Sequence, residues 1–234
     1  MGQHGKHRAL VSLGAAAALT LWAAAAEAQC RLALVLGLDI SSSVDAEEDA
    51  LQRQGLARAL VAPQVVQAAT ALPGQPVAIA VFEWSGRWQQ DLLLDWTLVE
   101  SAGDMERISA TIAASKRSYA DFPTAMGYAL GYASDLLRRA PPCLFRTLDL
   151  SGDGINNDGF GPALAYQNFP YDEVTVNGLV VTGHDQAVVT FFEREVRHGP
   201  GAFIEVARGF EDFERAMRRK LVRELGARVI GLAE

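Results

Sequence analysis

The sequence has no excess of positive charge, since 21 Lys and Arg stand against 28 Asp and Glu, for a net charge of −7. An acidic balance argues against nucleic acid and against an anionic membrane surface as the main partner. No segment after residue 28 is long and apolar enough to span a bilayer. Catalytic motifs are also lacking, because there is no P-loop and no convincing Ser-His-Asp set. We therefore expect a protein that is not an enzyme.

The one long apolar run lies at the N-terminus. Lys6 and Arg8 form a charged start, residues 10–26 form an apolar run of about 17 residues, and Ala26-Glu27-Ala28 offers a small-x-small cleavage site. This pattern predicts a secretory signal peptide over residues 1–28 and a mature domain over 29–234, periplasmic or secreted from a bacterium. A membrane anchor is the alternative, but the run is short and mostly alanine.

Short apolar runs alternate with longer amphipathic ones in the rest of the chain. We expect strands over residues 32–38, 76–82, 89–94, 144–150, 174–181 and 202–207. We expect helices over residues 44–61, 103–114, 124–139, 162–168, 185–197 and 210–225, with Pro63 ending the first. Only the second and third strands form a hairpin. The alternation predicts one α/β domain, with a doubly wound, mostly parallel sheet covered by helices on both faces.

Polar side chains gather where the carboxyl ends of such strands meet. Asp39, Ser41 and Ser43 follow the first strand, Thr124 opens a helix, and Asp153 follows the strand that ends at Leu150. In a loop that leaves a strand, residues two apart can point the same way, so the D-x-S-x-S spacing can aim three oxygens at one ion. An all-oxygen set without Cys or His suits Mg²⁺, Mn²⁺ or Ca²⁺ and not zinc or copper.

The motifs D-I-S-S-S at 39–43, T-A-M-G at 124–127 and S-G-D-G at 151–154 resemble the metal-ion-dependent adhesion site (MIDAS) of von Willebrand factor A (vWA) domains, in the same order and at matching intervals. From about Leu32 to Leu225 the chain also resembles an uncharacterised family of secreted bacterial vWA-domain proteins. The stretches that carry this second resemblance are 44–48, 82–86, 199–203, 210–213 and 219–221. The resemblance implies a six-stranded sheet with one antiparallel edge strand.

The resemblance also implies a role for each site residue. Ser41, Ser43 and Thr124 would give hydroxyl oxygens to the ion, and Asp39 and Asp153 would bind it directly or through water. Mg²⁺ is the first expectation for the cation, with Mn²⁺ or Ca²⁺ as alternatives. The last coordination position would accept an acidic group from a partner, either a protein or an envelope component.

Cysteine is scarce, and Cys30 and Cys143 are the only two in the chain. Cys30 lies nine residues before Asp39, and Cys143 lies ten before Asp153. In the vWA family the two strands concerned are adjacent and parallel, so the resemblance puts both cysteines at the opposite edge of the sheet and within disulfide reach. We predict a Cys30–Cys143 disulfide, which export makes chemically possible.

Several residues near the expected site stay open. Asn156 and Asn157 either shape access to the ion or only make turns. His184 is a candidate for a position beside the ligands or for an ordinary loop residue. The tryptophans of the hairpin either pack against the sheet edge or form a binding patch; they are Trp84, Trp88 and Trp96. Glu83 is read as an ordinary strand-end charge.

The leading hypothesis for function is a binding module that uses a metal ion and performs no chemical step. The alternative is a Mg²⁺-dependent phosphotransfer or hydrolase enzyme with Asp39 as nucleophile, although that chemistry usually has a second acid where Ser41 stands. A third hypothesis is a structural envelope domain with a vestigial site, against which the intact set of five residues argues.

Overall fold

The computed structural model describes residues 1–2, 30–183 and 186–230. In this part of the chain one six-stranded sheet has the order β3-β2-β1-β4-β5-β6. All neighbouring strands run parallel except β2 and β3, which form the predicted hairpin at one edge of the sheet. The strands are β1 (Cys30–Asp39), β2 (Val77–Trp84), β3 (Gln90–Val99), β4 (Cys143–Gly152), β5 (Val174–Thr182) and β6 (Ile204–Arg208). The predicted fold class is therefore confirmed.

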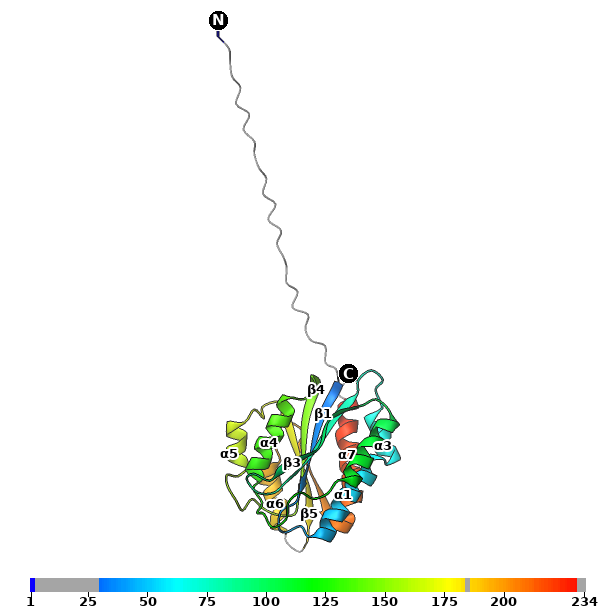
Figure 1. The fold of residues 1–234 in the computed structure, drawn as a ribbon, viewed down its shortest axis with the longest axis vertical. Helices are drawn as coiled ribbons and strands as arrows, with labels where there is room; N and C mark the ends of the chain where they lie inside the picture. The colour runs from blue at the N-terminus through cyan, green and yellow to red at the C-terminus, as the bar shows by residue number, and fades with distance from the viewer. Residues whose placement is uncertain (3–29, 184–185, 231–234) are drawn as a thin grey trace.

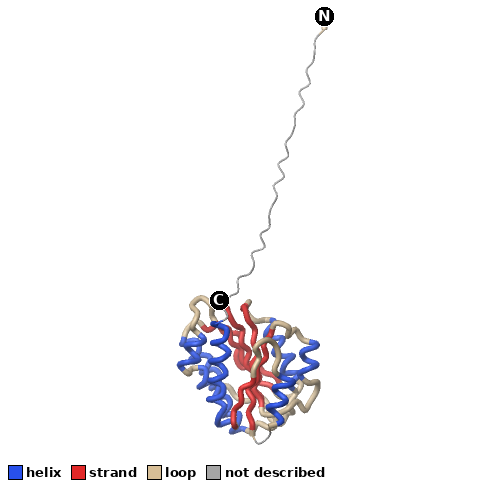
Figure 2. The backbone as a smooth tube through the Cα atoms, turned by 180° about the vertical axis from the view of Figure 1, so that it is seen from behind, coloured by secondary structure: helices blue, strands red, loops and turns tan. Residues whose placement is uncertain are grey.

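Helices cover both faces of this sheet. In Figure 1, α1, α3 and α7 lie on one side and α4, α5 and α6 on the other, and Figure 2 shows the same layers from behind. The helix bounds are α1 (Ala46–Leu60), α2 (Pro63–Ala69), α3 (Ala102–Ala114), α4 (Met126–Arg138), α5 (Pro162–Asn168), α6 (Ala187–Phe191) and α7 (Phe213–Ile230), with a π-helical turn η1 (Phe192–Val196) and a 3₁₀ turn η2 (Phe210–Asp212).

The central strand β1 is apolar because both of its faces are covered. All ten of its residues are buried. Leu34 and Leu36 pack into the core beneath α1 and α7, whereas Val35 between them packs into the core beneath α4. This alternation follows the two-residue period of a strand, and it explains why the run Leu32–Leu38 is continuously apolar.

Three elements differ from their predictions. Pro63 does not only end the first helix: it stands at the first turn of the separate helix α2, where proline loses no helical hydrogen bond. Strand β3 runs to Val99, whereas the prediction ended it at residue 94. Its residues are half-buried and its pairing with β2 shifts register, so no continuous apolar run marks its second half. The helix expected over 185–197 is short and closes in the π-helical turn η1.

The predicted disulfide is present and joins β1 to β4. Cys30 and Cys143 are paired residues of the two strands, with Cα atoms 4.5 Å apart, and their sulfur atoms form a disulfide bond. The bridge spans 113 residues of sequence. On the chain-entropy model a loop of this length stabilises the fold by about 4–5 kcal/mol. It fastens the two strands at the end opposite Asp39.

The predicted signal peptide lies outside the described residues except for positions 1 and 2. Among the helices that the structure describes, none is long and apolar enough to cross a membrane.

Candidate metal centre

Three loops meet at the carboxyl edge of β1 and β4. Asp39 is the last residue of β1, and its Oδ1 accepts a hydrogen bond from the backbone N–H of Ser41 at 2.7 Å. The Ser43 hydroxyl lies 3.1 Å from the Ser41 hydroxyl and donates to Asp153 Oδ1 at 2.7 Å. The alternating side chains of the 39–43 loop therefore point the same way, as the D-x-S-x-S spacing predicts.

Thr124 joins the same cluster from the start of α4. A Cβ atom placed on Gly154 would lie 3.4 Å from Thr124 Oγ1 and 3.9 Å from Ser43 Oγ, so both hydroxyls face one small space. A Cβ atom on Gly152 would lie 2.9 Å from Asp39 Oδ2. The glycines that flank Asp153 thus let the other side chains close in on it. The structure brings all five predicted residues together.

The two carboxylates of this cluster have no internal countercharge. Asp39 is fully buried, and its Oδ2 has no hydrogen-bond partner. Burial, and then the charge of Asp153, raises the pKa of Asp39 to about 7. Burial also raises the pKa of Asp153. In the described residues, no Lys or Arg forms an ion pair with either carboxylate.

An orphaned carboxylate oxygen, a second carboxylate and three hydroxyls fit a hard divalent cation. Asp39 and Ser41 are buried, but Ser43 is exposed, so an ion held by these oxygens would face solvent on one side. No group of three or more His, Cys, Asp or Glu suited to a metal occurs in the described chain. The candidate centre thus depends on hydroxyl oxygens as much as on carboxylates.

Asn156 and Asn157 do more than form turns. The side-chain oxygen of Asn157 accepts a hydrogen bond from Thr124 N at 2.9 Å, and Asn157 N donates to Thr124 O at 3.0 Å. The side-chain oxygen of Asn156 accepts from Met126 N at 2.8 Å. The loop that follows Asp153 therefore holds the start of α4, and with it Thr124, in position.

Arg117 is a supporting residue that the sequence did not reveal. Its guanidinium donates to the carbonyl oxygens of Val44 at 2.7 Å, Ile40 at 2.8 Å and Ser41 at 3.1 Å. It also donates to Tyr119 O in its own loop at 2.6 Å. One side chain thus ties the loop before Thr124 to the loop that carries Asp39, Ser41 and Ser43. Because its partners are backbone carbonyls, no motif marks it.

Glu83 is not an ordinary strand-end charge, and that interpretation was wrong. Its side chain is fully buried, pairs with Arg53 and accepts a hydrogen bond from Ser118 N at 2.8 Å. Arg53 pairs in turn with Asp49 at 2.9 Å. This buried network holds Ser118, the neighbour of Arg117, in place. It therefore helps to fix the 115–123 loop, from which Arg117 contacts the loop of the candidate ligands.

The three tryptophans have different environments. Trp84 is fully buried, and Trp96 donates from its indole nitrogen to Leu136 O at 3.0 Å, so packing is the correct interpretation for both. Trp88 is 80% exposed. His184 lies outside the described residues, so its predicted place beside the site stays a prediction.

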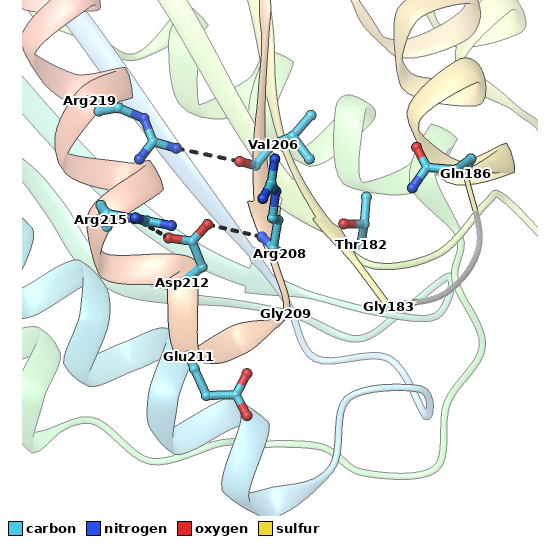
Figure 3. A pocket seen from close by; sticks show the side chains of 10 residues that line it. All are labelled: Thr182, Gly183, Gln186, Val206, Arg208, Gly209, Glu211, Asp212, Arg215 and Arg219. Atoms are coloured by element: carbon cyan, nitrogen blue, oxygen red, sulfur yellow. Dashed lines mark hydrogen bonds and ion pairs between the residues drawn. The ribbon is translucent and has the colours of Figure 1, made fainter.

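A separate pocket of about 970 Å³ lies where β5, β6 and α7 approach one another (Figure 3). Three of its charged residues are engaged in ion pairs. Asp212 pairs with Arg215 at 2.6 Å and accepts from the backbone N–H of Arg208 at 3.1 Å. Arg219 pairs with Glu205 at 2.7 Å. None of the five candidate ligands lines this pocket.

Comparison with known families decides where the chain belongs. The family described as "Protein of unknown function (DUF1194)" matches residues 29–229, which is most of the chain. The chain belongs to this family. No curated protein matches it.

The fold of this DUF1194 chain is that of vWA domains. Proximal thread matrix protein 1 from the mussel byssus, in a structure "with zinc occupied MIDAS motif", is 17% identical, with 85% of this chain and 48% of that chain covered and a TM-score of 0.62. A von Willebrand factor type A structure from Catenulispora acidiphila is 15% identical, with 84% and 43% covered and a TM-score of 0.58.

The protein BatB from Bacteroides thetaiotaomicron is 14% identical, with 85% of this chain and 99% of that chain covered and a TM-score of 0.60. The DUF1194 chain spans about half the length of the mussel protein structures that it matches. Identities this low show a shared fold, so the function has to be argued from the site of this chain.

Proposed function

We propose that this DUF1194 protein holds one divalent cation, with Mg²⁺ as the first candidate, at the carboxyl edge of β1 and β4. Ser41, Ser43 and Thr124 supply hydroxyl oxygens, and Asp39 and Asp153 bind directly or through water. The observation that carries the proposal is the buried Asp39 Oδ2, which has no partner and lies beside a second carboxylate. The zinc-occupied MIDAS of the mussel protein supports a divalent ion in this fold.

The cation would bind an acidic group of a partner, either a protein or an envelope component. Two carboxylates only balance the charge of a divalent ion, and hydroxyl ligands leave it strongly Lewis acidic, so an incoming carboxylate completes the coordination favourably. The exposed side at Ser43 gives such a group access. Recognition of this kind needs no chemical step.

The enzymatic alternative gains no support from the geometry. Asp39 is fully buried, and Oδ1 already accepts the N–H of Ser41, so the side chain is poorly placed to attack a phosphate. A vestigial site is also disfavoured, because Arg117, Asn156 and Asn157 hold the ligand loops together through backbone hydrogen bonds.

Export from a bacterial cytoplasm belongs to the same proposal. Residues 1–28 would direct the chain to the periplasm or the medium, and the Cys30–Cys143 bond fits an oxidising compartment. Mass spectrometry of the mature protein tests this point, with Gln29 expected as the first residue.

The deciding experiment is calorimetry with Mg²⁺, Mn²⁺ and Ca²⁺ on the wild type and on Asp39→Asn. The matched control is Asp45→Asn, an exposed helix cap six residues away that asparagine also serves well. We expect one site in the wild type and in the control and a loss of at least 100-fold in Asp39→Asn. Equal affinity in all three would refute the site. Turnover of a phosphate ester that is lost in Asp39→Asn would refute the binding-module function.

A further inference from the structure

Trp88 is 80% exposed and lies in the turn between β2 and β3. Its turn is fastened to the Thr124 segment by several contacts. Ser85 O accepts from Ala125 N at 2.8 Å, and Arg87 pairs with Asp158 through two bonds of 2.7 and 3.0 Å. Asp158 N donates in turn to Thr124 O at 3.3 Å. The turn that carries Trp88 is therefore held against the segment that contains Thr124.

Trp88 begins a continuous series of aromatic rings, which we call the aromatic ladder: Trp88, Tyr128, Phe160 and Phe169. Consecutive ring centroids are 6.0, 4.5 and 6.3 Å apart. The ladder runs from the metal edge along α4 to α5, two helices that lie side by side in Figure 1. Beyond Trp88, its members are partly exposed.

The ladder is mounted on the same helix that Thr124 precedes. Gly127, part of the T-A-M-G motif, lies so close to Phe160 that a Cβ atom would come within 2.5 Å of the ring. Gly131, one turn further on, would place a Cβ atom 3.0 Å from the Phe169 ring. The two glycines let these rings lie directly on the backbone of α4, so the ladder and the candidate ligand share one rigid support.

The ladder ends in an apolar hollow of about 280 Å³, lined by Phe160, Leu164, Asn168 and Phe169. Leu164 is 52% exposed there. Asn168 is the one polar residue of the lining, and one of its amide N–H groups donates to Leu164 O at 2.8 Å. The hollow is therefore suited to an apolar side chain and offers little to a sugar, which needs converging hydrogen-bond partners.

We propose, on the basis of the function proposed above, that the aromatic ladder and its hollow form the second half of the docking surface. The occupant is an extended polypeptide segment of the partner. Its Asp or Glu binds the metal ion, and an aromatic or branched aliphatic side chain within about five positions lies on the ladder. Tyr128 follows Thr124 by four residues and lies in the first turn of α4, so the ladder starts close to the candidate ligand.

Charge favours this division of labour. The chain carries a net charge of −7, so an acidic partner is attracted only at short range, by the ion itself. A carboxylate on a metal ion is also common to all acidic ligands and does not select among them. The apolar contacts beside it are what distinguish one acidic segment from another.

The test selects random linear peptides on the full chain in Mg²⁺ and elutes them with a chelator. One selected peptide is then titrated against the wild type, Trp88→Ser, Leu164→Ser and Leu144→Ser. Leu144 is the matched control, because it is equally exposed, at 52%, but lies at the start of β4 on the opposite edge. We expect the selected peptides to contain an Asp or Glu with an apolar residue within about five positions of it. We also expect at least a tenfold loss in the first two variants, no change in the control and unchanged Mg²⁺ affinity in all of them.

The outcomes separate this inference from the function on which it rests. Acidic peptides without an apolar preference, or binding that is insensitive to Trp88→Ser and Leu164→Ser, would overturn the docking surface and leave the metal-dependent module standing. The same holds if an acidic polysaccharide binds through Trp88 and no peptide is selected. If the chelator elutes no peptide and no acidic polysaccharide binds, both proposals would be overturned.

Discussion

Two acidic residues, Asp149 in β4 and Asp153 directly after it, each lie near a second carboxylate but in opposite surroundings. Asp149, inside the molecule, faces Glu224, and Asp153, at the end of the strand, faces Asp39. The ammonium group of Lys220 lies between the inner pair, 2.8 Å from Asp149 Oδ1 and 2.7 Å from Glu224 Oε1. At the outer pair, hydroxyl groups approach the carboxylates, and no Lys or Arg of the described chain pairs with either one.

The comparison shows which acidic pair is structural. Burial raises the pKa of both Asp39 and Asp149 to about 7, because loss of water disfavours the charged form of each carboxylate. Lys220 pairs with both acids of the inner pair, and Asn177 donates a hydrogen bond to Glu224 at 2.6 Å. The outer pair lies beside hydroxyl oxygens, which are ligands that a divalent cation from solution uses. The inner cluster thus holds its own countercharge, although Asp149 Oδ2 and Glu224 Oε2 accept no hydrogen bond, while the outer set suits an ion from solution.

The largest expected effect comes from removing the inner cation. Lys220→Met leaves two buried acids without a countercharge, so we expect a loss of about 3–5 kcal/mol in the free energy of unfolding, measured in urea. Arg219→Met on the same helix breaks an exposed pair with Glu205 and is expected to cost under about 1 kcal/mol.

If Lys220→Met does not fold at all, the triple variant Asp149→Leu, Lys220→Met, Glu224→Leu decides the matter. It removes every charge of the cluster, and we expect it to fold again. A Lys220→Met variant as stable as Arg219→Met would show that the cluster of Asp149, Lys220 and Glu224 does not stabilise the fold.

The outer pair is expected to respond in the opposite sense. Asp39→Asn removes a buried charge without a partner and keeps an oxygen that can accept the N–H of Ser41, so the metal-free protein should be as stable as the wild type or more so. Metal should stabilise the wild type and not the variant, in thermal unfolding with and without Mg²⁺. A metal-free variant that is several kcal/mol less stable would make Asp39 a structural residue.

The pH dependence sharpens the same contrast. A proton competes with the metal for Asp39, whose pKa without metal is about 7. Metal affinity should therefore fall by up to tenfold for each pH unit below about 7 and level off above it. Calorimetry across this range measures it, and a flat profile from pH 5 to 8 would contradict the role of Asp39.

The stability of the metal-free protein also depends on pH, in the opposite direction to metal affinity. The folded state holds the Asp39 proton more tightly than the unfolded chain, so this contribution falls as the pH rises from 3.8 to about 7. Mg²⁺ should offset that fall at the outer pair. The contribution of Asp149 has the same sign, but metal should leave it unchanged.

A smaller effect is expected from the residues that hold Thr124. Asn157→Ala removes the acceptor for Thr124 N, and Asn156→Ala removes the acceptor for Met126 N. We expect about a tenfold loss of metal affinity in each, in line with other supporting residues around metal ligands. Asn168→Ala, on α5 and away from the ligands, is the control. Unchanged affinity in both variants would reduce the asparagines to turn formers.

Much of this arrangement was predictable because it depends on local patterns. Continuous apolar runs marked the strands, and the spacing of Asp39, Ser41 and Ser43 marked the ligand loop. The adjacency of two strands that the vWA resemblance implies, together with the count from each cysteine to the metal edge, placed Cys30 opposite Cys143. Each of these signals is carried by residue types at fixed intervals along the chain.

What escaped prediction depends on contacts between distant segments. Arg117 donates to carbonyl groups more than 70 residues away, and backbone acceptors leave no trace in the sequence. Lys220 follows two arginines in a charged helix, and only its phase, three residues after Met217 and four before Glu224, puts it on the buried side. Glu83 was misread for the same reason, since its partner Arg53 lies on another element.

An anomalous diffraction map from crystals grown or soaked with Mn²⁺ shows directly whether a cation binds between Asp39 and Asp153. We expect one strong peak within about 2–2.5 Å of the Ser41 and Ser43 hydroxyls, next to Asp39, Thr124 and Asp153. No peak at that edge of the sheet, or a peak between Asp149 and Glu224 in place of Lys220, would contradict the proposed metal centre.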